Sequence, residues 1–203
     1  MDKRHVRVNV NLTLFIILIL MSRFCFMNVY AKDIIIDDRS SGSTVSNLGK
    51  DWRLITDQVM GGKSTGSLSH DNYLGRNCLR MKGQVSTKNN GGFIQIALDL
   101  TTDKPFDASA YEGITIDVAG NNEQYNLHLR TSDLWLPWQS YRAVFNATEQ
   151  WNTIKIPFSQ LIPYRTFRAF RKNKIERIGL VAIGREFNAG LCVGSVRFYG
   201  TTD

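Results

Sequence analysis

Short stretches in which apolar and polar residues alternate recur along this 203-residue chain. The cleanest example spans residues 93–100, where every second residue is a large apolar one: Ile94, Ile96, Leu98 and Leu100. Successive side chains of a strand point to opposite faces, so this pattern predicts one face in the core and the other at least partly wet. No segment of helical length shows convincing helical spacing, except weakly around Phe158 to Ile162. An all-β protein is therefore predicted.

About ten such strands are expected, separated by turn signals every eight to twelve residues or so. Regular short strands of this kind favour a β-sandwich, and the lack of strand-helix alternation argues against a Rossmann-type sheet. The predicted strands cover residues 33–38, 52–56, 64–69, 78–82, 93–100, 114–118, 125–130, 141–145, 151–156, 178–183 and 191–199.

The amino terminus has the pattern of an export signal. Lys3, Arg4 and Arg7 precede an apolar run at 12–21, and Val29-Tyr30-Ala31 supplies small residues where a signal peptidase cuts. The run is about ten residues long, whereas a bilayer-spanning helix needs roughly twenty. Residues 1–31 are therefore predicted to be a signal peptide, which meets the membrane only transiently. Residues 32–203 are expected to form one exported domain, periplasmic or secreted.

The net charge of the chain is concentrated in one segment. The formal charge is +7, and removal of four basic and one acidic residue with the leader lowers it to +4. Much of this excess lies in Arg165, Arg168, Arg171, Lys172, Lys174 and Arg177. Such a run can attract an anionic surface, but a solvated loop is the more common arrangement. No nucleic-acid motif accompanies it, and export makes nucleic acid a poor partner, so none is predicted.

Two glycine pairs mark tight loops. Two adjacent glycines allow positive φ, and Asn-Gly between strands is a strong hairpin signal. Neither loop has the glycine spacing of a phosphate cradle. Asp57 is the best single carboxylate of the chain, although a turn-capping Asp is more common than a general base. The residues singled out in these loops are Asp57, Met60, Gly61, Gly62, Ser64, Asn90, Gly91 and Gly92.

Cys78 and Cys192 remain after removal of the leader, in what should be an oxidising compartment. They are either joined in one disulfide or buried as free thiols, and the sequence leaves both possibilities open. Neither cysteine has a ligand partner at short spacing, so no metal site is predicted. No cofactor is predicted either.

A candidate ligand surface follows from the strand at 125–130. Alternation turns its polar residues to the face opposite Leu127 and Leu129, and an aromatic segment follows directly. Planar rings beside amide and guanidinium donors suit sugars and protein side chains. Alternatively, the two tryptophans pack over the end of the sandwich and Arg130 is a buried ion-pair partner. The candidates are Asn126, His128, Arg130, Trp135, Trp138, Gln139 and Arg142.

An ordered series of motifs resembles the complex I intermediate-associated protein family. It begins at Trp52 and Asp57-x-Val59-Met60-Gly61-Gly62-x-Ser64, and continues through Asn89-Asn90-Gly91-Gly92-Phe93. Further matches follow at Tyr111-x-Gly113, Tyr125-x-Leu127-x-Leu129-Arg130 and Trp151-x-x-Ile154-x-Ile156-Pro157-Phe158. The resemblance implies a galactose-binding-domain-like jelly roll. For mitochondrial members it also implies a non-catalytic factor that holds subunits of NADH:ubiquinone oxidoreductase during assembly.

No nucleophile with a base, carboxylate pair or metal cluster is recognisable, so the chain is predicted not to be an enzyme. The first hypothesis is an exported protein-binding, assembly or chaperone-like factor, with a protein as its partner. The alternative is a carbohydrate-binding module. Coplanar exposed rings on a concave sheet would favour sugar, whereas one compact apolar patch with a polar rim would favour protein.

Overall fold

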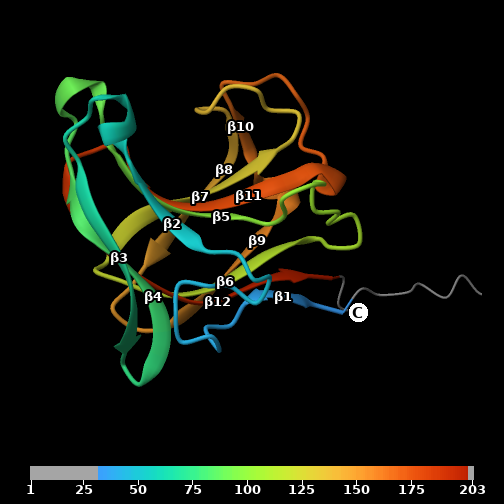
Figure 1. Cartoon of the computed structure of the whole chain (residues 1–203), viewed down its shortest axis with the longest axis horizontal. Coiled ribbons are helices and arrows are strands. Elements are labelled where there is room, and N and C mark those ends of the chain that lie inside the picture. Colours follow the sequence, from blue (N-terminus) through green and yellow to red (C-terminus); the bar gives the residue numbers. More distant parts are fainter. Residues whose placement is uncertain (1–31, 201–203) are drawn as a thin grey trace, which may run out of the picture. The chain divides into compact units, whose positions relative to one another are not determined.

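The computed structural model describes residues 32–200, which form an all-β sandwich of two antiparallel sheets (Figure 1). The predicted all-β jelly-roll fold is confirmed, with twelve strands in this region where about ten were expected. The predicted signal peptide lies outside the described residues. Within residues 32–200, no helix has the length and apolarity of a membrane span.

One sheet is organised around the longest strand, β12. Its amino-terminal half pairs with β4, and β1 pairs with its carboxyl-terminal half; β6 pairs with residues 192–199. The order is β3-β4-β12-β6-β9. The bounds are β1 (Ile34–Asp37), β3 (Thr65–Tyr73), β4 (Arg76–Val85), β6 (Gly113–Ala119), β9 (Asn152–Pro157) and β12 (Phe187–Tyr199).

The second sheet has the order β10-β8-β7-β11-β5-β2. Its bounds are β2 (Trp52–Thr56), β5 (Phe93–Asp99), β7 (Glu123–Thr131), β8 (Ser140–Ala147), β10 (Ile162–Tyr164) and β11 (Ile175–Ile183). Four single 3-10 turns connect the strands: η1 (Asp57–Met60), η2 (Lys88–Asn90), η3 (Phe158–Gln160) and η4 (Lys172–Lys174). The weak helical spacing at 158–162 thus corresponds to one 3-10 turn followed by the short strand β10.

The core fills the space between the two sheets, and the strand alternation explains which residues enter it. Ile94, Ile96 and Leu98 of β5 are fully buried, as are Leu127 and Leu129 of β7. They meet apolar residues of the opposite sheet in one continuous cluster, which includes Leu79, Met81, Ile114, Ile116, Val118 and Phe198. Burial of each such side chain stabilises the fold by roughly 1.5–3 kcal/mol.

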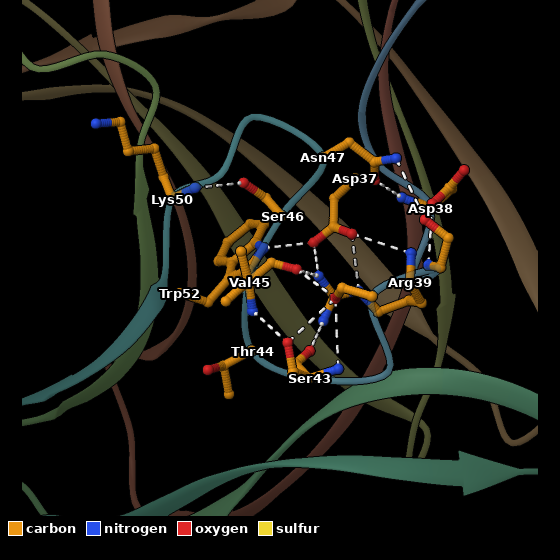
Figure 2. Close-up of polar contacts among 12 residues, drawn as sticks. Asp37, Asp38, Arg39, Ser43, Thr44, Val45, Ser46, Asn47, Lys50 and Trp52 are labelled. Carbon is orange, nitrogen blue, oxygen red and sulfur yellow. Dashed lines mark hydrogen bonds and ion pairs between the residues drawn. The ribbon is translucent and has the colours of Figure 1, made fainter.

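A buried polar cluster joins the two sheets at the start of the domain (Figure 2). Asp37, at the end of β1, accepts a 2.7 Å hydrogen bond from the indole nitrogen of Trp52, the first residue of β2. It also forms an ion pair with Arg39, whose side chain is as buried as its own. Arg39 in turn donates to the carbonyl oxygens of Ser43 and Val45. The segment that crosses between the sheets is therefore held at both ends. The serine-rich composition of residues 39–44 indicates a loop but not this buried cluster.

Candidate functional site

The open face of the second sheet, which is turned away from the core, carries most of the candidate residues. Strand register places Asn126 beside Val144 and Val181, and His128 beside Arg142 and Gly179. Figure 1 shows η1 and η2 standing at one side of this sheet, and β10 with its following loop at the other. The predicted polar row of β7 therefore lies on the expected face.

The middle of the open face has a floor of small or apolar residues: Ala97, Gly179 and Val181. An added Cβ at Gly179 would lie 2.7 Å from Nε2 of Gln95, which is too close for a real contact. Glycine at this position thus lets the Gln95 side chain lie across the neighbouring strand. Ala97, Gly179 and Val181 are themselves buried, so longer side chains such as Gln95 cover this floor.

His128 is less accessible than the sequence suggested. Only 8% of the residue is exposed, although alternation predicted a row facing solvent or a ligand. Burial, with a smaller contribution from the charge of Arg142, lowers the pKa of His128 to about 3. Its Nε2 has no hydrogen-bond partner among the described residues. At neutral pH this histidine is uncharged. It belongs to the buried floor of the face and is not an exposed contact residue.

Arg142 lies at the border of the floor. Its guanidinium group is 3.4 Å from the ring centroid of Tyr164 on β10, and its Nε donates to the hydroxyl of Ser140 at 2.8 Å. Burial lowers the pKa of Arg142. No carboxylate in residues 32–200 forms an ion pair with it. This cation is fixed by stacking, and its remaining donors are available to an acceptor on the open face.

Arg130 holds a neighbouring loop, a role that the sequence did not predict. Its two terminal nitrogens donate to the carbonyl oxygens of Leu134, Leu136, Pro137 and Gln139, at 2.6 to 3.1 Å. It is not the buried ion-pair partner of the alternative interpretation, and its contact with a ligand stays a prediction. Arg130 therefore links the loop of residues 134–139 to β7 and satisfies backbone carbonyl groups that would otherwise lack a donor.

Gln139 supports the same loop from the other side. Its Oε1 accepts from the backbone of Leu136 at 3.1 Å, and its Nε2 donates to the carbonyl of Arg165 at 3.0 Å. The loop therefore holds Trp135 and Trp138 outward, with 83% and 47% of each residue exposed. The alternative in which both tryptophans pack over the sandwich is therefore wrong for Trp135, whereas Trp138 is about half buried.

A pocket of about 320 Å³ opens beside this loop, at the end of the face where β5 finishes and β11 begins. Asp99 forms ion pairs with Arg53 and Arg177, and Nε of Arg177 is 2.5 Å from the carboxylate. The volume is at the lower end of small-ligand pockets, which span roughly 300–1,000 Å³. Its lining comprises Asp99, Thr101, Thr102, Asp103, Lys104, Pro105, Arg130, Trp135, Pro137, Glu176 and Arg177.

Sequence reasoning missed the acidic half of this pocket. Alternation along residues 93–100 puts Asp99 on the wet face of its strand, and Arg177 belongs to the basic run, but nothing in the sequence joins the two. Register shows why they meet: Arg177 of β11 lies opposite Asp99 on one side and Arg130 on the other. A polar residue at the end of each of three strands was the signal available.

The glycine loops lie at the opposite end of the sheet and are built around Asp57. This fully buried carboxylate accepts hydrogen bonds from Ser64 through both its backbone N–H and its hydroxyl, at 2.9 and 2.5 Å. The backbone N–H groups of Gly92 and Phe93 donate to it as well. Burial raises the pKa of Asp57, but these hydrogen bonds outweigh it and hold the pKa below its usual value. Asp57 is a structural hub joining the two loops.

The glycines of these loops are required for two different reasons. Gly61 and Gly92 have φ of 88° and 131°, which side chains resist. Gly91 has φ of −76°, which any residue can adopt, but a Cβ there would lie 2.4 Å from Asp57 Oδ2. A Cβ at Gly62 would lie 2.2 Å from the same carboxyl group. Asn90 also has positive φ, and Met60 is exposed at the tip of η1.

The two cysteines are joined. Cys78 of β4 and Cys192 of β12 form a disulfide with their Cα atoms 5.4 Å apart, which settles the alternative of free thiols. The bridge links neighbouring strands of the first sheet, away from the open face, where Tyr73 and Trp151 pack against it. Residues 32–200 contain no group of three or more His, Cys, Asp or Glu that could hold a metal ion.

Comparison with known structures places the same fold among carbohydrate-binding modules. A family 11 module from Clostridium thermocellum, solved with a β-1,3-1,4-mixed-linked tetrasaccharide, matches with a TM-score of 0.68 and 14% identity over 85% of this chain and 99% of that chain. A family 30 module of a cellulosomal cellulase from the same organism matches with a TM-score of 0.60 and 15% identity over 85% and 100%. At these identities the similarity shows the fold alone.

Sequence comparison gives the family. No curated protein sequence matched the chain. A family model described as complex I intermediate-associated protein 30 matches residues 43–192, which is most of the described domain and includes both glycine loops, the strand β7 and the loop that Arg130 supports. The chain therefore belongs to the complex I intermediate-associated protein 30 (CIA30) family.

Proposed function

We propose that this protein is a non-catalytic binding module whose open face takes a carbohydrate, with the pocket beside Trp135 as its strongest subsite. The observation that carries the proposal is the pairing, in one pocket, of an exposed indole with Asp99, Glu176 and Arg177. An indole face suits the apolar face of a sugar ring, and carboxylate and guanidinium groups suit its hydroxyls. The carbohydrate-binding modules of the same fold support this choice of ligand class.

The expected mode of binding is stacking at one end and hydrogen bonding along the face. Trp135 is held in place by the carbonyl contacts of Arg130, so little ordering is required when a ligand arrives. Beyond the pocket, the proposed ligand would meet the half-buried polar side chains of Gln95 and Asn126 on the open face. The proposal relies on the predicted signal peptide, because the domain would meet extracellular glycans only after export.

Titration calorimetry with a mixed-linked β-glucan tetrasaccharide, alongside a glycan array, tests the proposal. Trp135→Ala should weaken binding about thirtyfold, since loss of a central aromatic anchor costs roughly 2 kcal/mol. Because this side chain is mostly exposed, the thermal midpoint should stay near that of the parent. Leu74→Ala, an exposed apolar residue in the turn between β3 and β4, is the matched control and should bind normally. No binding to any glycan on the array would contradict the proposal.

A protein partner is the second candidate, and it is favoured by family membership together with one surface. Exposed apolar residues gather at the β8–β10 side of the open face: Leu136, Trp138, Val144, Ile162 and Tyr164. A compact apolar patch with charged neighbours is typical of a protein interface. In this reading the chain is an exported assembly or chaperone-like factor. Capture of one defined protein from an envelope extract, lost in Ile162→Ser but retained in Trp135→Ala, would favour it over the carbohydrate.

A further inference from the structure

The loop between β10 and β11, residues 165–174, has a charge and shape that neither candidate function uses. It carries five basic residues and no acidic one. Arg171 pairs with Asp133, and Lys172 lies 3.2 Å from Glu112. Among the described residues, no carboxylate pairs with Arg165, Arg168 or Lys174. The loop therefore presents a net positive charge to its surroundings. In Figure 1 it is the orange segment that leads from β10 to β11.

Of the two phenylalanines in this loop, one packs against the core and the other faces solvent. Phe170 packs against Tyr141 and Phe158, with ring centroids 5.0 and 5.2 Å away, and so continues the core. Phe167, three residues earlier, is fully exposed. No packing within residues 32–200 accounts for an aromatic ring at this position. The ring therefore lies in water between Arg165 and Arg168, where it can meet a surface from outside.

The loop is fixed from beneath, so the exposure of Phe167 is not that of a loose segment. The Tyr141 hydroxyl lies 3.1 Å from the carbonyl oxygens of both Arg168 and Ala169. Gln139 donates to the carbonyl of Arg165, and Nε of Arg171 donates to Asp133 at 2.6 Å. The backbone on both sides of Phe167 is thus anchored to β8 and to the loop that follows β7, and the ring is held at the tip.

We propose that this tip docks on an anionic lipid surface, with Phe167 inserted at the level of the headgroups and Arg165 and Arg168 bound to lipid phosphates. Charge complementarity selects an anionic partner, and guanidinium groups suit phosphate oxygens. The exposed Phe167 ring has the place that aromatic side chains take at the headgroup level of a bilayer. An interfacial aromatic with flanking arginines is the arrangement that membrane surfaces favour.

Vesicle co-sedimentation tests this proposal with residues 32–203, which contain the whole core cluster without the apolar leader. The probes are vesicles of phosphatidylcholine alone and of equal parts phosphatidylcholine and phosphatidylserine. The parent should bind the anionic vesicles and not the neutral ones. Arg165→Gln with Arg168→Gln should reduce partitioning about 25-fold, since each basic residue near such a surface contributes roughly fivefold. Phe167→Ala should reduce it about tenfold.

Leu74→Ala serves again as control, because it removes an exposed apolar side chain from a turn that carries no comparable basic run. It should bind like the parent. Failure of the parent to bind anionic vesicles would overturn the proposal, and so would equal binding of Phe167→Ala and parent, since charge alone would then explain the attachment. Binding of an acidic polypeptide such as polyglutamate with the same dependence on Phe167 would point to a protein partner and also overturn it. None of these outcomes changes the calorimetry at the pocket.

Discussion

The indole nitrogen of Trp52 donates a 2.7 Å hydrogen bond to the carboxylate of Asp37, and this contact joins the first strands of the two sheets. Asp37 also forms an ion pair with Arg39, and both side chains are 2% exposed. Burial lowers the pKa of Arg39 to about 10, which still leaves it charged at neutral pH. The carboxylate is therefore the only acidic counter-charge that the structure gives this buried cation in residues 32–200.

Asp37→Asn should destabilise the domain by roughly 3–5 kcal/mol, because it leaves the Arg39 charge buried without its partner. The double variant Asp37→Leu with Arg39→Met should recover part of this loss, since both charges are then gone. Urea denaturation followed by tryptophan fluorescence measures each variant. Asp38→Asn, at an exposed neighbouring carboxylate, should cost less than about 1 kcal/mol. If Asp37→Asn and Asp38→Asn lower the free energy of unfolding equally, the buried pair of Asp37 and Arg39 is not a central contact.

Substitutions in the two glycine loops should destabilise the domain for two different reasons, a steric clash at Gly91 and backbone strain at Gly61. Gly91→Ala would force a Cβ to within 2.4 Å of Asp57 Oδ2, so it should disturb the carboxylate that holds both loops together. Gly61→Val should cost roughly 1–3 kcal/mol through φ of 88° alone, since no atom lies near its Cβ position. Thermal melts compare the two with Gly49→Ala, where φ is positive and no atom lies within 4 Å of the added Cβ. If Gly91→Ala melts with the parent, the loops rearrange freely around Asp57.

His128 should make the folded domain sensitive to mild acid. Its folded pKa is about 3, whereas a histidine in the unfolded chain titrates near 6.5. Above about pH 6.5 both states are neutral, and the full stability is present. Between about pH 6.5 and 3 only the unfolded state takes up the proton, so stability falls by up to about 1.4 kcal/mol per pH unit, and below pH 3 this contribution levels off.

Denaturant titrations at several pH values check this expectation. His128→Gln should flatten the slope between about pH 6.5 and 4, whereas His70→Gln, at an exposed position on β3, should retain it. Asp57 adds a separate loss at lower pH: because its folded pKa is depressed, its contribution is present above the unfolded value and disappears as the pH falls through the folded one. An unchanged slope in His128→Gln would show that the burial of this histidine is relieved in solution.

The disulfide closes a long loop, because its cysteines are 114 positions apart in the sequence. Such a cross-link restricts the unfolded chain, and its loss typically costs roughly 2–5 kcal/mol. Cys78→Ala with Cys192→Ala should therefore lower the denaturation midpoint while keeping the circular dichroism of the sandwich. Ala119, Tyr73 and Trp151 still pack around the site. A double variant as stable as the parent would mean that packing alone holds β4 against β12.

Local alternation was enough to predict the strands and the inward faces of β5 and β7, because side-chain period is a property of consecutive residues. It did not predict that His128 would be buried, since that depends on Arg142 and other long side chains from neighbouring strands. The Asp37, Arg39 and Trp52 cluster was hidden because a buried arginine in a serine-rich loop looks like a solvated one. Asp99 and Arg177 are 78 residues apart, and only strand register brings them together.

Trp138 and Arg130 are both candidate ligand residues, but the structure separates the effects expected of their variants. Arg130 donates to four carbonyls of the loop that displays both tryptophans, so Arg130→Ala should loosen this loop and weaken binding indirectly. Trp138→Ala removes a half-exposed ring and should weaken binding of a ligand on the β8 side without changing the loop. Amide hydrogen exchange across residues 134–139 distinguishes the two: faster exchange is expected in Arg130→Ala only. Arg130→Lys should remain partly loosened, because an ammonium group cannot span four carbonyls as a guanidinium does. If exchange in Arg130→Ala matches the parent while binding is lost, Arg130 contacts the ligand itself.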